Sequence, residues 1–239
     1  MKSVLRRWLF LVTFLPLTIA LMGNGVAVPL VQSEPPPFGL PFQDPPGPET
    51  WLLIQPYGNT VSAYRQQSSM YAAGQGLHFG VDFSARCGYP IVAIGDGVVA
   101  KVDALEHGAA PHNLIIDHSN GYASFYGHLL ERPDLQVGQP ISKGQVIAKV
   151  GDPDQTCTSR PHLHLEIRNA GLYNRAYNPI PLIAADWDTL ALIGASSLGF
   201  EQDLNNPRQW QHLDDQPQVK FGGARLNNYA NPWPPDWSR

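Results

Sequence analysis

The sequence has few charged residues and no excess of positive charge. Of its 239 residues only 15% are Asp, Glu, Lys or Arg, and the formal net charge is -4. Disordered chains are rich in charge and poor in apolar residues, whereas this chain is 43% hydrophobic, so global disorder is excluded. A protein that tracks nucleic-acid phosphates needs a basic surface. We therefore expect one globular domain with tails and no nucleic-acid partner.

Long hydrophobic runs are scarce, and the run near the N-terminus is too short to span a bilayer. It covers residues 8–22, contains Pro16, follows three basic residues and precedes small residues at 25–27. A membrane-spanning helix needs roughly 20 apolar residues, whereas this pattern is typical of a secretory signal. We predict a signal peptide over residues 1–27, membrane contact only during export, and a periplasmic or extracellular location. An uncleaved anchor is the alternative.

Cysteine is nearly absent, since Cys87 and Cys157 are the only two. An even number in a chain bound for an oxidising compartment favours one disulfide. In the chain-entropy model, closing so long a loop stabilises the fold by at most about 4 kcal/mol. The alternative is a pair of unrelated buried thiols. Metal binding by the cysteines is disfavoured, because better metal ligands crowd the same region.

Long helical patterns are also lacking. From about residue 51 to 183, short apolar runs alternate with turn signals, which predicts an all-β domain. Turns at 95–97 and 119–121 predict antiparallel hairpins with positive φ, and paired turns at 137–140 and 143–145 are typical of a compact barrel-sandwich. The predicted strands are residues 61–64, 79–83, 91–94, 98–102, 114–116, 123–126, 145–150 and 162–167.

Two segments of different composition flank the predicted domain, which we assign to residues 50–183. Residues 28–49 are so rich in proline that helix and central strand are excluded, which leaves an extended linker or a strap. Residues 184–239 are predicted to form an extension that wraps back on the domain, with a short helix over 190–198. Its tryptophans are expected to anchor it, with a sugar-binding platform as the alternative. They are Trp187, Trp210, Trp233 and Trp237.

Four of the eight histidines fall, with one aspartate, into three short motifs. These are HFGVD at 78–82, YGHL at 126–129 and PHLHLE at 161–166. Residues two apart on a strand share a face, so His162, His164 and Glu166 are expected to point one way. The apolar residues 163, 165 and 167 are then expected to point to the core. The remaining histidines, which have no such partners nearby in sequence, are His107, His112, His118 and His212.

The first motif requires a bend if its two polar residues are to bind one metal ion. His78 and Asp82 share a face, but a straight strand would separate them by about 13 Å. Zinc needs donor atoms within roughly 2.0 to 2.2 Å of itself. Gly80 lies between them and permits the bend. In the last motif, Glu166 is expected to hydrogen-bond a ligand imidazole, with a surface salt bridge as the alternative.

The three motifs resemble those of the LytM/lysostaphin-type zinc metallopeptidases, and with the intervening turns the resemblance covers roughly residues 55–182. It implies the antiparallel barrel-sandwich with a duplicated hybrid motif that this family shares. It also implies one zinc ion per chain with His78, Asp82 and His164 as ligands, and His128 and His162 as catalytic histidines. Three protein ligands and one open position are the arrangement of a catalytic zinc.

The same resemblance implies an exported metalloendopeptidase that cleaves the peptide stems or cross-bridges of peptidoglycan. The chain departs from the family at 156–160, Thr-Cys-Thr-Ser-Arg, where a small-residue Ser-Thr-Gly loop is usual. Arg160 is therefore expected to narrow or charge the cleft. One alternative is a silent wall-binding or hydrolase-activating module, but such relatives usually lose one of the five site residues. The others are a carrier module modified at Lys143 and an enzyme that cleaves other proteins. The oligomeric state is left open.

Overall fold

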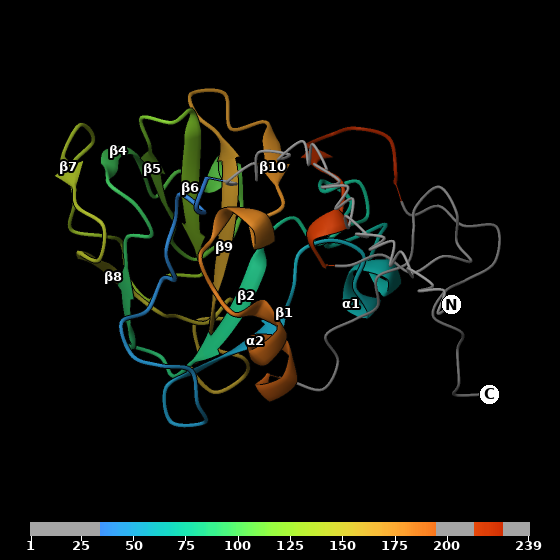
Figure 1. The fold of residues 1–239 in the computed structure, drawn as a ribbon, viewed down its shortest axis with the longest axis horizontal. Coiled ribbons are helices and arrows are strands. Elements are labelled where there is room, and N and C mark those ends of the chain that lie inside the picture. The colour runs from blue at the N-terminus through green and yellow to red at the C-terminus, as the bar shows by residue number, and fades with distance from the viewer. Residues whose placement is uncertain (1–33, 195–212, 227–239) are drawn as a thin grey trace, which may run out of the picture. The chain divides into compact units, whose positions relative to one another are not determined.

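The computed structural model describes residues 34–194 and 213–226, and its main feature is antiparallel β-sheet (Figure 1). The strands are β1 Trp51–Gln55, β2 Val81–Ala85, β3 Pro90–Val92, β4 Gly97–Val102, β5 Leu114–Asp117, β6 Tyr122–Gly127, β7 Pro140–Ile141, β8 Val146–Lys149, β9 His162–Asn169, β10 Arg175–Tyr177 and β11 Val219–Lys220. Nine of them form one sheet, in which β1-β2-β9-β6-β5-β4-β7 are successive neighbours. β10 pairs with β9 and β11, and β3 pairs with β8 as a separate two-stranded sheet.

Helices are short in the described part of the chain. The α-helices are α1 Val61–Arg65 and α2 Trp187–Ile193, and single 3-10 turns are η1 Leu105–His107, η2 Ile180–Leu182 and η3 Leu213–Asp215. Among these residues no helix has the length and apolar character needed to cross a lipid bilayer. The predicted signal peptide at 1–27 lies outside the described residues, so it remains a prediction.

The predicted antiparallel β fold is confirmed, and seven of the eight predicted runs overlap a strand. Among the described strands the large sheet is open, with β1 and β7 at its ends, and shows no closed barrel. The prediction for residues 61–64 is wrong, because these residues form α1. Thr60 has extended backbone and its hydroxyl accepts a hydrogen bond from the Ala63 N–H, which caps the first helical turn.

The two predicted hairpins have different outcomes. β5 and β6 pair across residues 118–121, where Gly121 has a φ of +85°, as predicted. The hairpin at 95–97 is wrong, because β3 pairs with β8 while β4 pairs with β5 and β7. Here the chain crosses between the sheets, and glycine is needed for space: a Cβ on Gly97 would lie 2.5 Å from the Asp117 carbonyl oxygen.

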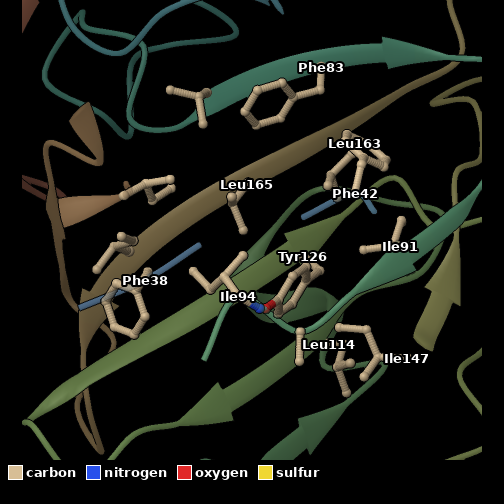
Figure 2. Close-up of a cluster of buried hydrophobic side chains, with 14 of the residues drawn as sticks. Phe38, Phe42, Phe83, Ile91, Ile94, Leu114, Tyr126, Ile147, Leu163 and Leu165 are labelled. Atoms are coloured by element: carbon tan, nitrogen blue, oxygen red, sulfur yellow. The ribbon is translucent and has the colours of Figure 1, made fainter. Parts of the chain in front are cut away.

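Both sheets contribute side chains to one hydrophobic core (Figure 2). Leu163 and Leu165 of β9 are fully buried, as the alternating pattern predicted, and they share the cluster with Ile91 of β3 and Ile147 of β8. Tyr126 is also fully buried, and its hydroxyl accepts a hydrogen bond from a backbone N–H at 3.0 Å. The core therefore fixes the face of β9 that points away from the histidines.

The proline-rich segment packs as a strap where it is described. Phe38 is 1% exposed, and its backbone pairs with Ile183 in an isolated parallel bridge. Phe42 is also buried and stacks on Trp51 with 5.1 Å between the ring centroids. Burying one such ring stabilises a fold by roughly 1.5 to 3 kcal/mol. Residues 35–49 therefore form a strap that packs on the domain, rather than an extended linker.

The C-terminal extension is described only in part. α2 begins three residues before the predicted helix, because the Asp186 carboxylate accepts from the Thr189 N–H as an N-cap. Trp187 donates to the Ile183 carbonyl oxygen and packs partly buried against the core, which agrees with an anchoring role. The predicted helix end and the predicted anchors Trp210, Trp233 and Trp237 lie outside the described residues, as does His212.

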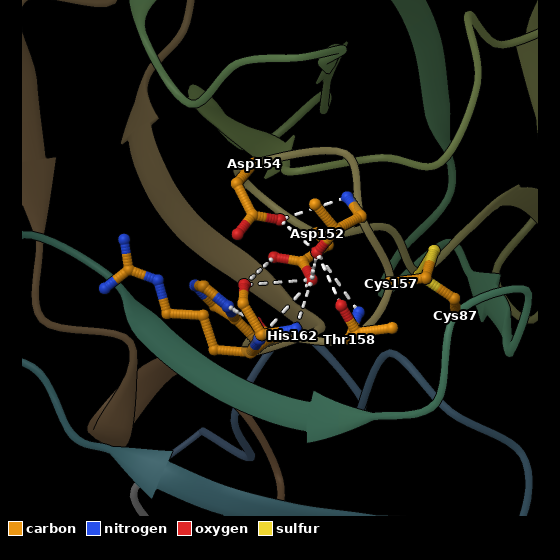
Figure 3. The surroundings of a disulfide bond; sticks show 9 residues. Cys87, Asp152, Asp154, Cys157, Thr158 and His162 are labelled. Carbon is orange, nitrogen blue, oxygen red and sulfur yellow. Dashed lines mark hydrogen bonds between the residues drawn. A yellow bond between two sulfur atoms is a disulfide. The ribbon is translucent and has the colours of Figure 1, made fainter.

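The predicted disulfide is present. Cys87 and Cys157 are bonded, with 5.7 Å between their Cα atoms and a sequence separation of 70 residues. The bridge joins the loop that follows β2 to the loop that precedes β9 (Figure 3). The chain leaving β2 and the chain entering β9 are thus covalently tied, at the neighbouring ends of two strands that carry residues of the first and third motifs.

Replacing both cysteines by alanine should lower the free energy of unfolding by up to about 4 kcal/mol, because the unfolded chain regains the entropy of a long open loop. Equilibrium unfolding in guanidinium chloride measures this difference. The oxidised wild-type protein should be the more stable, and reductant should bring it to the level of the double variant while leaving the variant unchanged. Equal stability of all four samples would show that the bridge does not stabilise the fold.

Candidate metal centre

Three polar side chains converge from two neighbouring strands. Asp82 of β2 lies directly opposite His164 of β9, and His78 precedes β2. The Asp82 carboxylate oxygen Oδ1 lies 2.7 Å from His164 Nδ1 and 3.2 Å from His78 Nε2. The two ring nitrogens lie 3.3 Å from each other. One nitrogen from each imidazole and one carboxylate oxygen, all within 4.8 Å of one another, suit a divalent metal ion.

The chain bends between His78 and Asp82, as predicted, and Gly80 lies at the bend. The reason for glycine is space. A Cβ on Gly80 would lie 2.7 Å from His164 Cε1 and 2.7 Å from the Leu165 carbonyl oxygen. Its φ is not in the left-handed region that favours glycine. The missing side chain therefore lets β9 and the His164 ring approach the first motif closely.

Hydrogen bonds outside the cluster orient both imidazoles. His78 Nδ1 lies 2.7 Å from the Pro56 carbonyl oxygen, which can only accept, so the proton of the neutral ring is on Nδ1 and Nε2 is free to bind a cation. His164 Nε2 lies 3.2 Å from Glu166 Oε1, which is the predicted contact. Glu166 is 1% exposed, so the alternative of a surface salt bridge is wrong.

Arg168 completes this arrangement and was not anticipated from the sequence. Its Nε and Nη2 donate to the two carboxylate oxygens of Glu166 at 2.7 and 2.8 Å. The guanidinium lies 4.2 Å from the ring centroid of Phe125 and 4.7 Å from that of Phe221. Burying two charges costs free energy unless they pair in good geometry and their remaining polar atoms are hydrogen-bonded. The two parallel hydrogen bonds between Arg168 and Glu166 provide that geometry. Arg168 thereby holds Glu166 against His164.

Electrostatics prepare the cluster for a cation. Burial opposes ionisation of Asp82, but His78 and His164 outweigh it and hold the pKa of the carboxyl well below its usual value. Burial likewise opposes protonation of His164, yet its hydrogen bonds to Asp82 and Glu166 raise its pKa to about 9. Without a metal the imidazole therefore carries a proton at neutral pH. A divalent cation would take the place of that proton.

The other two predicted site residues lie beside the cluster. The rings of His128 and His162 are 4.7 Å apart, and His128 is 5.9 Å from His164. His128 Nδ1 donates to the Ala110 carbonyl oxygen, and His162 Nδ1 donates to that of Arg160 at 2.8 Å. Nε2 is then the basic nitrogen of each neutral ring. Burial, followed by the charges of His164 and His162, lowers the pKa of His128 to about 4.

His128 also has an unusual backbone. Its φ is +57°, a left-handed conformation that is uncommon for a residue other than glycine. A backbone hydrogen bond from the His128 N–H to the Ala109 carbonyl oxygen holds this geometry directly after β6. Such strained positions cluster at functional sites. The structure thus brings the five predicted residues together, while their division into ligands and catalytic groups stays a prediction.

The cluster opens into a cleft of about 730 Å³. Its walls include Tyr71 from the loop before the first motif, Phe221 from the C-terminal segment, and the exposed apolar side chains Met70 and Leu172. None of these residues belongs to the three motifs, so the motifs did not predict them. Phe221 reaches the cleft because β11 pairs with β10 at the edge of the sheet, a pairing that no local sequence signal indicated.

Residues 76–179 match the profile of peptidase family M23. This stretch of the chain is therefore similar to M23 domains. The resemblance to the LytM/lysostaphin type is confirmed by its relatives, which include lysostaphin of Staphylococcus simulans at 28% identity over 109 residues, 45% of this chain and 22% of that protein.

Two further relatives of this stretch are more similar in sequence. One is an uncharacterized metalloprotease of Haemophilus influenzae, 37% identical over 120 residues, which are 50% of this chain and 22% of the relative. The other is the peptidoglycan DD-endopeptidase ShyC of Vibrio cholerae, 35% identical over 96 residues, 40% and 21% of the respective chains. The matches cover about a fifth of these relatives' length.

Among solved structures, the catalytic domain of the M23 protein EnpA from Enterococcus faecalis aligns with a TM-score of 0.45 at 25% identity. The alignment covers 59% of this chain and 95% of the EnpA chain.

Gly80→Ala should weaken the binding of divalent metal at least about 10-fold, because the added methyl group collides with the His164 ring and displaces one donor. Competition with a chromophoric chelator measures the affinity. Gly47→Ala is the matched control, since its methyl group would meet only the Thr50 hydroxyl at an ordinary 3.6 Å. Equal affinities of the two variants would contradict the assigned role of Gly80.

Proposed function

We propose that this chain is an exported zinc-dependent metalloendopeptidase that hydrolyses peptide bonds in peptidoglycan stems or cross-bridges. The observation that carries the proposal is the convergence of three metal donors beside two histidines that each have one free basic nitrogen, all within one cleft. The match to peptidase family M23 and the relatives named as peptidoglycan endopeptidases support the same activity. Export rests on the sequence pattern of residues 1–27.

In this proposal His78, Asp82 and His164 hold the zinc ion. Two imidazoles and one carboxylate are a donor set that zinc favours, and three protein ligands leave a position for water or substrate. When bound, zinc lowers the pKa of water to about 7 and polarises a carbonyl oxygen. Glu166, fixed by Arg168, keeps the His164 ring in the orientation that the ion needs.

His128 and His162 perform the proton chemistry in this proposal. Because Nδ1 of each ring is committed to a backbone carbonyl, Nε2 is the nitrogen that accepts or returns a proton. The low pKa of His128 keeps that ring neutral at physiological pH, as a proton acceptor requires. A ring that has taken up a proton at Nε2 would donate a hydrogen bond to the substrate oxygen on which negative charge develops, and would then pass that proton to the departing amine.

The deciding experiment measures metal content and wall hydrolysis on the same purified protein. We expect about one zinc per chain by mass spectrometry, and a fall in the turbidity of purified cell walls. A chelator should abolish the fall and added zinc should restore it. A zinc-bound protein that leaves walls intact would favour the silent wall-binding module. A protein that cleaves other proteins but not cell walls would show that peptidoglycan is not its substrate.

Two alanine variants separate the roles within the site. His164→Ala should lose bound metal, whereas His128→Ala should keep the metal and lose activity by about 10²- to 10⁴-fold, the usual contribution of a general acid or base. His112→Ala is the matched control, because its imidazole pairs with Asp103 away from the cleft lining. It should retain both metal and activity. Equal metal loss in the first two variants would overturn the division of roles.

A further inference from the structure

The loop that leads into β9 carries Arg160, whose main chain is held in place by hydrogen bonds. Asp152 is 1% exposed and accepts hydrogen bonds from the Ser159 hydroxyl at 2.9 Å and from the Arg160 N–H at 3.4 Å (Figure 3). The Arg160 carbonyl oxygen accepts from His162 Nδ1 at 2.8 Å. The disulfide at Cys157 ties the same loop to the end of β2. The main chain of Arg160 is thus held on both sides, next to a candidate catalytic histidine.

The Arg160 side chain, in contrast, is exposed and lines the cleft. Its guanidinium forms no hydrogen bond or ion pair with any residue that the structure describes. It does lie close enough to Tyr71 for its charge to oppose the rise that burial causes in the pKa of that phenol. A guanidinium offers five N–H donors in a fork that matches a carboxylate. It is therefore available to a ligand.

The other charged side chains that line the cleft, unlike Arg160, each lie close to a group of opposite charge or to an imidazole. Asp82 lies between His78 and His164, and Arg168 is paired with Glu166. Glu106 lies at the mouth with 68% of its side chain exposed, 3.8 Å from an imidazole. Among the described lining residues, Arg160 is thus the one arginine without an anionic partner, so its guanidinium can pair with a negative group on a substrate.

We propose that Arg160 binds a carboxylate of the substrate beside the scissile bond, so that the cleft selects anionic stem peptides over neutral oligoglycine bridges. This inference rests on the proposed function and names the substrate class for it. Arg160 is two residues from His162, and one extended residue spans about 3.3 to 3.6 Å. We therefore place the recognised carboxylate on a residue close to the cleaved bond. An oligoglycine has no side-chain carboxylate in that place.

Binding of a matched peptide pair tests the inference. The probe is an end-blocked peptidoglycan stem peptide whose single glutamate carboxylate is either free or amidated. Its affinity is measured by calorimetry on the zinc-loaded full chain in the His128→Ala background, so that the peptide is not consumed. We expect the free carboxylate to bind on the order of 10-fold more tightly than the amide, as for a charge-assisted pair that remains partly solvated.

Three variants at surface arginines make the result specific. Arg160→Gln should reduce the preference to near unity, because glutamine keeps length and polarity but has no charge. Arg160→Lys should retain part of it, since an ammonium attracts the carboxylate without the fork. Arg132→Gln, which removes an exposed charge outside the cleft lining, should retain all of it. A preference that survives Arg160→Gln would come from the metal or another group and would overturn the assignment.

The remaining outcomes separate this inference from the proposed function. Equal binding of the two peptides, or binding of neither, overturns the inference. Wall hydrolysis by the wild-type protein is scored independently. A chain that dissolves walls without a carboxylate preference refutes the inference alone. A chain that shows the preference, holds zinc and dissolves no walls refutes the proposed hydrolysis and supports the carboxylate site.

Discussion

The pairing of β2 with β9 is the interaction on which the whole site depends. In this register Asp82 faces His164, and β9 is paired on its other side with β6, which ends one residue before His128. Because side chains alternate along a strand, a slip of one residue would turn His164 into the core and a leucine toward the cleft. Burial of Leu163 and Leu165 on the opposite face makes that slip costly. The same leucines that stabilise the domain thus determine where the imidazoles point.

Local patterns predicted much of the fold because most strands alternate visibly or end in turns with a clear chemistry. They failed where a four-residue run is too short to distinguish strand from helix, and the Thr60 cap decided for helix at 61–65. They failed again at 95–97, since Gly-Asp-Gly has the composition of a hairpin, whereas packing against Asp117 sends the chain to the other sheet. Such a choice depends on contacts between distant residues, which composition does not encode.

In the candidate site, too, residues within local motifs were predictable and residues placed by long-range packing were not. The motif residues were predictable because each motif is short and its spacing has a geometric meaning. Arg168 is part of the same strand as His164, yet its role depends on Phe125 and Phe221, which reach it from β6 and from the end of the described chain. Tyr71 and Phe221 line the cleft without belonging to any motif. Long-range packing supplied these residues, and a single sequence carries no signal for it.

The contribution of Phe221 has a consequence for where this domain ends. The family match stops at residue 179, but β11 and Phe221 follow it and cover one side of the Arg168 guanidinium. A protein cut at that homology boundary would admit water to the ion pair that steadies Glu166, and the higher dielectric would weaken it. A form of the domain that keeps this ion pair shielded therefore includes Phe221, which lies beyond the residues that match the family profile.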